Sequence, residues 1–190
     1  MKKYEILKDD YIELEGTILY RIKALKDFGG IEVGQLGGYI EKEDNLSQDN
    51  DCWIYNGAKV YGAAEVSGGA EISGVAEIYG AAKIRGAAKV YGEAKVYGAA
   101  EVYGVSEIYG AAKVYGAAEI AGVVEIYGEA KVYGAAEVSG IAKVYGSAEI
   151  SGAAEIHGGA KVYGSAKVSG AAEVYGDIFS NTTVIKRTYY

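Results

Sequence analysis

The sequence predicts an all-β protein: a single-stranded parallel β-helix, or β-solenoid, of about seven triangular coils of 18 residues behind a non-repeat N-terminal cap. Three observations predict it. An Ile or Val occupies every sixth position from Ile54 to Val174, 21 times without an insertion or deletion. A small residue, nearly always Ala, stands two positions before each of them, and a Gly stands two positions after nearly all. Half of the chain is apolar, which excludes a disordered, solvated polymer despite 29 glycines.

The six-residue unit A-[KE]-[IV]-Y-G-A suits a strand better than a helix. Its period does not match 3.6, and one Gly per unit would cost a helix about 1 kcal/mol each time. In a strand, residues two apart share a face, so Ala and Ile/Val point inward while Lys or Glu and Tyr point outward. The Gly then supplies a corner with positive φ. Three units close one turn, which gives coils of 18 residues.

The repeat divides the chain into three parts. Residues 1–51 break the hexad and are interpreted as an N-terminal cap of short strands and turns, with YEIL (4–7) and YIEL (11–14) as separate strands. Residues 52–177 form the β-helix, and residues 178–190 form a closing strand laid across the last coil, because the register fails at Ser180. Caps are expected because an uncovered strand edge promotes polymerisation.

A period of 18 sorts the outward residues into three faces with different charge. Face one has balanced charges and carries Tyr55, Tyr91, Tyr109, Tyr127, Tyr145 and Tyr163. Face two carries Tyr61, Tyr79, Tyr97, Tyr115 and Tyr133, with five lysines against two glutamates for a net +3: Lys59, Lys95, Lys113, Lys131, Lys167, Glu77 and Glu149. Face three has six glutamates against two basic residues for a net −4: Glu65, Glu101, Glu119, Glu137, Glu155, Glu173, Lys83 and Arg85.

The N-terminal part of the repeat resembles a known family. The hexad is similar to that of hexapeptide-repeat left-handed β-helices, and LGGYIEKEDNLSQDNDCWIYNGAKVYG (36–62) looks like the entry segment of the YdcK-like β-solenoid family of bacteria and phages. The resemblance implies a left-handed coil, which the spacing alone does not determine. By analogy with phage-borne solenoids, it also implies a small rigid protein that inhibits a host or defence protein.

The resemblance to hexapeptide β-helices also raises acyltransferase chemistry, which needs a catalytic His and usually a loop that closes the donor site. No loop leaves the coil, and the single histidine, His157, points outward beside Glu155. We therefore predict a chain that is not an enzyme, with no catalytic, cofactor-binding or metal-ligating residues. The alternative is an acyltransferase relative whose active site is lost or supplied by a partner.

Two further groups of residues have ordinary interpretations. An acidic cluster precedes the repeat and is interpreted as a solvated loop, although it could bind a cation: Glu41, Glu43, Asp44, Asp49 and Asp51. The single cysteine, Cys52, occupies an inward small-residue position and is expected to fill the core, and one Cys excludes a disulfide scaffold.

Nucleic-acid chemistry fits the faces poorly. Duplex DNA carries one charge per about 1.7 Å, whereas face three offers one per about 4.8 Å, so an acidic DNA mimic remains a lesser alternative. Tyrosines one coil apart stack on each other and leave no slot for a base. Such ladders also have a purely structural explanation, because like aromatics stabilise adjacent strands.

These exclusions leave a protein-binding or structural module that acts through its flat faces on a protein partner or on itself, without a small-molecule substrate or membrane contact. The start of the chain lacks an apolar segment of signal-peptide length, so we expect a soluble cytoplasmic protein. The candidate binding residues are Tyr79, Tyr97, Tyr115, Tyr133, Tyr91, Tyr109, Tyr127, Glu101, Glu119, Glu137 and Glu155.

Overall fold

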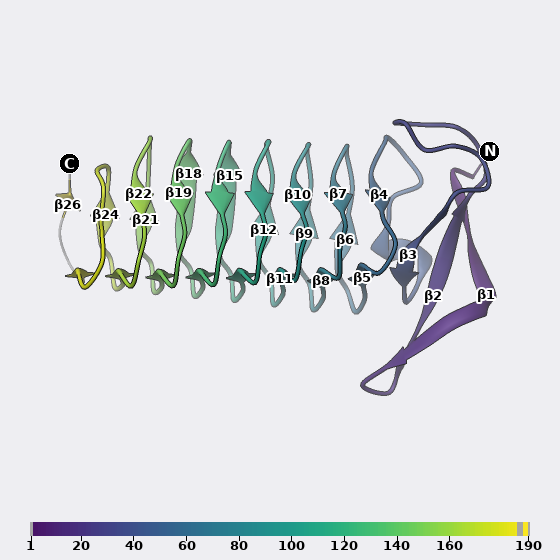
Figure 1. Ribbon diagram of the computed structural model, residues 1–190, viewed down its shortest axis with the longest axis horizontal. Helices are drawn as coiled ribbons and strands as arrows, with labels where there is room; N and C mark the ends of the chain where they lie inside the picture. The colour runs from purple at the N-terminus through teal and green to yellow at the C-terminus, as the bar shows by residue number, and fades with distance from the viewer. Residues whose placement is uncertain (1, 186–187, 190) are drawn as a thin grey trace.

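Strand pairing in the computed structural model, which describes residues 2–185 and 188–189, confirms the 18-residue coil. Val60 pairs in parallel with Ile78, and Ile78 pairs with Val96. The same step repeats on all three sides, so the chain forms a β-solenoid of about eight turns with its termini at opposite ends (Figure 1). The handedness of the coil stays a prediction from the resemblance.

Three sheets run along the solenoid, one beneath each face. The seven-stranded sheet beneath face one comprises β4 (Trp53–Ile54), β7 (Glu71–Ile72), β10 (Lys89–Val90), β13 (Glu107–Ile108), β16 (Glu125–Ile126), β19 (Lys143–Val144) and β22 (Lys161–Val162). The eleven-stranded sheet beneath face two comprises β1 (Tyr4–Leu14), β2 (Thr17–Ala24), β3 (Leu36–Ile40), β5 (Lys59–Val60), β8 (Glu77–Ile78), β11 (Lys95–Val96), β14 (Lys113–Val114), β17 (Lys131–Val132), β20 (Glu149–Ile150), β23 (Lys167–Val168) and β25 (Thr183–Val184). The eight-stranded sheet beneath face three comprises β6 (Glu65–Val66), β9 (Lys83–Ile84), β12 (Glu101–Val102), β15 (Glu119–Gly122), β18 (Glu137–Gly140), β21 (Glu155–Ile156), β24 (Glu173–Val174) and β26 (Thr188–Tyr189).

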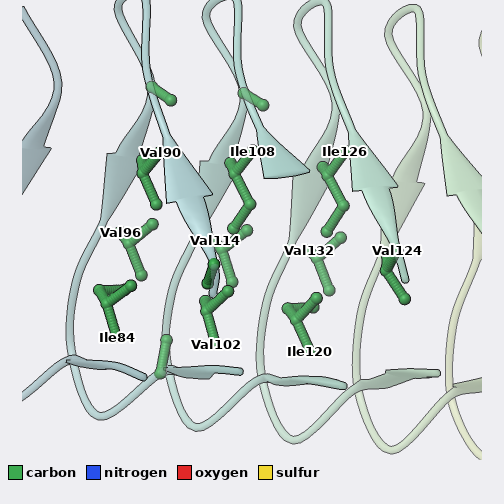
Figure 2. Close-up of a cluster of buried hydrophobic side chains, with 14 of the residues drawn as sticks. Ile84, Val90, Val96, Val102, Ile108, Val114, Ile120, Val124, Ile126 and Val132 are labelled. Atoms are coloured by element: carbon green, nitrogen blue, oxygen red, sulfur yellow. The ribbon is translucent and has the colours of Figure 1, made fainter. Parts of the chain in front are cut away.

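The coil interior is built from the residues that the hexad places inward. The repeat's Ile and Val side chains and the small residues two before them are buried, with an exposed fraction of 1% or less. Figure 2 shows these side chains in rows along the stack, for example Val90, Ile108 and Ile126. The outward tyrosines of the repeat are half-buried or exposed. The predicted division between inside and outside is therefore confirmed.

The corner glycines are required by both conformation and stacking. Gly98 has a φ of 74°, a conformation that side chains rarely adopt. A Cβ atom at Gly98 would also lie 2.9 Å from the backbone nitrogen of Gly116 in the next coil. The corners therefore stack backbone on backbone, which keeps successive coils in register.

A long hairpin extends the sheet of face two beyond the first coil. Strands β1 and β2 pair antiparallel, β2 pairs with β3, and β3 pairs in parallel with β5 (Figure 1). The prediction of separate strands at 4–7 and 11–14 is wrong, because both belong to β1. The pairing register shifts between Leu7 and Tyr11, so a bulge absorbs the intervening residues. A short 3-10 helix, η1 (Glu43–Asn45), precedes the first coil.

The C-terminal tail continues the solenoid with a shorter step. Ile178 bridges to Val162, and β25 pairs in parallel with β23, with Val184 opposite Val168. The step is thus sixteen residues at these two pairings and fifteen where β26 pairs with β24, rather than eighteen. Ile178 takes the inward place that the hexad would give to Ser180. The prediction of a strand laid across the last coil is wrong, because the tail stacks parallel to it. In the part of the chain that the structure describes, no helix has the length and apolar character needed to cross a membrane.

Candidate binding faces

The tyrosines of face two form a continuous stacked ladder. Ring centroids from Tyr61 to Tyr133 lie 4.8 to 5.1 Å apart, and neighbouring planes deviate by 8° or less. Partial burial raises the pKa of Tyr61 to about 12, helped by Glu77, and burial is also the main cause of the raised pKa of Tyr97. The ring faces are occupied by their neighbours, so a partner meets ring edges and hydroxyl groups.

Two glutamates form ion pairs with four of the five lysines of face two. Glu77 lies between Lys59 at 3.3 Å and Lys95 at 2.7 Å. Partial burial alone would raise the pKa of Glu77, but the hydrogen bonds and charges of these two lysines outweigh it and lower the pKa. Glu149 similarly lies between Lys131 at 3.3 Å and Lys167 at 3.5 Å.

Lys113 differs from the other lysines of this row. It is exposed and lies in register between Lys95 and Lys131, and no ion pair to it is found among the described residues. Lys95 and Lys131 already share their glutamates, so Lys113 has no ion-pair partner among the described residues of the lysine row. The further carboxylates beside it are Glu93 and Glu129, which line the same hollows as Lys113. The middle of face two is therefore its most basic part.

Face one carries a second tyrosine ladder with paired charges. Centroids from Tyr91 to Tyr163 lie 4.9 to 5.0 Å apart, and Ser73 interrupts the row before them. The hydroxyl of Tyr91 donates to Glu107 at 3.0 Å, and Lys143 pairs with Glu125 at 2.6 Å. Face one is thus flat and aromatic like face two, without its excess of positive charge.

Face three presents five glutamates side by side. Strand register aligns them along the stack as Glu101, Glu119, Glu137, Glu155 and Glu173. Glu101 pairs with Lys83 and Arg85, and Glu119 accepts a hydrogen bond from Tyr103. No ion pair to Glu137 is found in the described part of the chain. Like charges directly opposite each other are destabilising, so this row favours a basic partner.

Exposed apolar side chains line the corner that follows face three. Val105, Val123 and Ile141 expose 54%, 53% and 63% of their surface. Beside them β15 and β18 extend to four residues, and the small side chains of Ala121 and Ser139 lie opposite each other. The middle of face three is therefore flat, acidic and bordered by apolar surface.

His157 makes more contacts than the sequence indicated. Its Nε2 lies 3.0 Å from Glu155, as expected, and its Nδ1 lies 3.0 Å from the hydroxyl of Ser139. The ring stacks on Tyr175 at 5.1 Å. Sequence reasoning missed Ser139, although the 18-residue period places it one coil from His157. The hollow beside the cap and the two hollows beside face two do not include His157 among their lining residues.

The cap residues form a network around Cys52. Cys52 is fully buried, as expected, and its Sγ lies 3.3 Å from the ammonium of Lys3, which also donates to the Cys52 carbonyl at 2.9 Å. Burial raises the pKa of the Cys52 thiol, against the lowering effect of Lys3. Lys3 was not predicted as a buried residue, because nothing in its local sequence distinguishes it from a surface lysine.

The acidic cluster of the cap is engaged in separate contacts. Glu41 accepts a hydrogen bond from the backbone of Gly62 at 2.6 Å, and Glu43 pairs with Lys2 at 2.8 Å. Across the described residues, no three His, Cys, Asp or Glu side chains are grouped closely enough to hold a metal ion. The structure thus does not bring this cluster together as a ligand set.

The described residues form hollows on the outer surface at the cap and beside face two. One of about 270 Å³ adjoins the cap and is lined by Lys2, Tyr4 and Glu43 among others. Two more, of about 290 and 470 Å³, lie beside the lysine row of face two and share Lys113 and Ala111. None of the three is lined by an inward Ile or Val of the coil, which fits an interior that is filled.

Comparison with known proteins gives one partial match. No family model matches the chain. The chain is 36% identical over 64 residues to a protein of Escherichia coli (strain K12) named "Uncharacterized acetyltransferase YdcK". The match covers 30% of this chain and 19% of that relative, so the chain spans less than a fifth of its length.

This match and the observed coil support a hexapeptide-repeat β-helix with weak homology to YdcK. The match contradicts the prediction that the chain is not an enzyme, because the relative is named an acetyltransferase. A phage origin stays a prediction.

Proposed function

We propose that this chain is a rigid protein-binding module that acts through faces two and three. The observation that carries the proposal is the contrast in charge between two adjacent flat faces: a lysine row on face two, with Lys113 exposed at its middle, and the glutamate row in the middle of face three. Both faces rest on continuous sheets, so the backbone positions from which their side chains project are fixed before a partner arrives. Preorganised surfaces lose less entropy on binding.

The tyrosine ladder contributes to this role as a rigid, flat platform. Its rings are already stacked, so binding freezes few additional side-chain rotations. Aromatic residues are enriched at protein interfaces for the same reason. A binding role for the faces is compatible with the acetyltransferase activity in the relative's name.

Two triple variants test the proposal. Tyr79→Ser, Tyr97→Ser and Tyr115→Ser remove the middle of the ladder, and the fold should survive because Ser already stands at positions 151 and 169 of this row. Glu101→Lys, Glu119→Lys and Glu137→Lys invert the charge of face three. Proteins that co-purify with the tagged parent, and the chain's own solution mass, are compared between parent and variants.

The matched control is Glu71→Lys, Glu107→Lys and Glu125→Lys, which makes the same change of charge on face one. We expect at least one of the first two triples to lose an association that the control retains. If both triples associate like the parent, the binding role of these faces is wrong.

A further inference from the structure

We propose that face two binds face three of a second copy of this chain. This inference rests on the binding role above and names the partner. The two faces carry net charges of opposite sign, +3 and −4, from five lysines against two glutamates and six glutamates against two basic residues. Each copy therefore carries both halves of a complementary pair.

The complementarity extends along the stack. When two copies lie with their stacks parallel and their coils level, the strands of the two mated faces run in opposite directions, so the charged positions at one level lie diagonally across the interface. They have opposite sign at six of the seven levels. These pairs are Lys59 with Glu65, Glu77 with Lys83, Lys95 with Glu101, Lys113 with Glu119, Lys131 with Glu137, and Lys167 with Glu173. The exception is Glu149 with Glu155, and Glu149 is already held by two lysines of its own face.

The spacing of the charges favours a second solenoid over other partners. Successive side chains on each face are one coil apart, as the 4.8 Å separation of Tyr79 and Tyr97 illustrates. A helix or an irregular surface repeats its side chains at other distances, so contacts made at one coil would not continue at the next. A second copy has the same repeat, so a match at one level is maintained over the whole face.

The side chains that the pairing needs are accessible. Lys113, Glu119 and Glu137 are exposed and lie at the middle of their faces. The corner between faces two and three is Ala in every coil, so no large side chain prevents a close approach: Ala63, Ala81, Ala99, Ala117, Ala135, Ala153 and Ala171. Contact would neutralise the like-charged glutamate row and Lys113 together.

The area of a face is adequate for a specific interface. Seven coils at about 4.8 Å and a width of about 20 Å give roughly 670 Å², close to the ~800 Å² per partner of a standard interface. Because face two binds face three and not another face two, a row of copies always has one free face two at one end and one free face three at the other. With parallel stacks and level coils, successive copies are related by rotation about an axis along the stack; a rotation that divides 360° closes the assembly into a ring, and any other rotation leaves it open.

A charge-swap experiment tests the inference. Variant A carries Lys95→Glu, Lys113→Glu and Lys131→Glu, and variant B carries Glu101→Lys, Glu119→Lys and Glu137→Lys. The mass of each protein, alone and in equimolar mixture, is measured by light scattering at low salt and at about 0.5 M salt. Circular dichroism confirms that each variant keeps the parent's strand content.

The parent should form an assembly of several 20.0 kDa chains that weakens as salt rises. Variant A alone has two acidic faces and variant B alone has two basic faces, so each should lose at least about tenfold in self-affinity. The mixture restores both contacts when A and B alternate, and it should regain an assembly. If a triple variant fails to fold, Lys113→Glu and Glu119→Lys form a milder pair with the same expected restoration.

Three outcomes would overturn the inference: a parent that is monomeric at low salt and high concentration, variants A and B that keep the parent's mass, or a mixture that stays monomeric. The face-one triple described above is the control and should keep the parent's mass. A monomeric parent whose co-purifying proteins still change with the face variants refutes this inference alone. A parent with no association that either face affects refutes the binding role as well.

Discussion

In the repeat, residues 52–177, each inward side chain meets the same kind of neighbour in the coil before and the coil after, whereas in residues 2–51 most contacts occur once. Asn45 in the cap is an example: it is buried and donates to the carbonyls of Gly62 and Ala64 at 3.1 and 2.8 Å. Among the described residues, no other asparagine side chain makes this contact in a later coil. Stability is therefore distributed in the repeat and concentrated in the cap.

The largest effect is expected at Trp53, where residues of the cap pack on the first coil. Its side chain is fully buried and makes edge contacts with Phe28 and Tyr4, at centroid distances of 5.5 and 6.3 Å. Trp53→Ala should cost about 3–5 kcal/mol in the free energy of unfolding, measured by urea denaturation. The indole nitrogen has no hydrogen-bond partner among the described residues, so Trp53→Phe should cost less than about 2 kcal/mol. Equal losses for both variants would show that the indole itself is needed.

The second comparison uses two glycines of the repeat with the same backbone conformation. Gly98 has a φ of 74° and an added Cβ would contact the backbone of Gly116, whereas Gly158 has a φ of 60° and open space around the same position. Gly158→Ala should cost about 1 kcal/mol, from backbone strain alone. Gly98→Ala should cost about 2–4 kcal/mol, because the clash adds to the strain. Thermal denaturation of both variants measures the difference, and equal values would mean that the corners do not stack as tightly as observed.

The repeat could be predicted from the sequence because one rule, repeated in every hexad, determines which residues face inward. The cap could not be predicted in the same way. The burial of Lys3 depends on carbonyl groups near Cys52, 49 positions later, and no local pattern indicates such a contact. The two strands expected at 4–7 and 11–14 form one strand, β1, because a bulge between Leu7 and Tyr11 lets both segments pair with β2. The bulge depends on this pairing and not on the local sequence.

The candidate faces were predictable as rows of residues, but their distribution of charge was not. Counting charges gives face two a net +3, whereas the structure shows that Glu77 and Glu149 each pair with two lysines, and that Lys113 forms no ion pair with any described residue. That distinction depends on side-chain conformation. The contact of Ser139 with His157, in contrast, follows from the 18-residue period and could have been found in the sequence.

A smaller effect is expected in the tyrosine ladder. Tyr97 stacks on Tyr79 and Tyr115, both at 4.8 Å, whereas Tyr61 has one stacked neighbour of this row, Tyr79, at 5.1 Å. Aromatic pairs contribute about 0.5–1.5 kcal/mol each beyond their burial, so Tyr97→Ser should cost about 1–2 kcal/mol. Tyr61→Ser removes one stacked pair instead of two, so its cost in the free energy of unfolding should be smaller than that of Tyr97→Ser by the contribution of one pair. A larger loss at Tyr61 in urea denaturation would place the stabilisation in the cap instead of the ladder.

The smallest effect is expected for the charges of the outer faces. Glu77 pairs with Lys59 and Lys95, and these lysines lower its pKa from the ordinary 4.5 despite partial burial. A lowered pKa means that the folded state holds its proton more weakly than the unfolded chain. The stabilisation by Glu77 is therefore present above pH 4.5 and is lost as the pH falls through the folded-state pKa. Glu77→Gln should cost less than about 1 kcal/mol at pH 7, because the pair is partly solvated. The difference in the free energy of unfolding between variant and parent should disappear in acid.

Glu137→Gln is the matched control. It removes a charge that has only like-charged neighbours in its row, so it should leave stability unchanged or raise it slightly. Urea denaturation of the parent, Glu77→Gln and Glu137→Gln at pH 7 and in acid measures each free energy of unfolding. If Glu137→Gln loses as much stability at pH 7 as Glu77→Gln, the lysine partners of Glu77 contribute nothing.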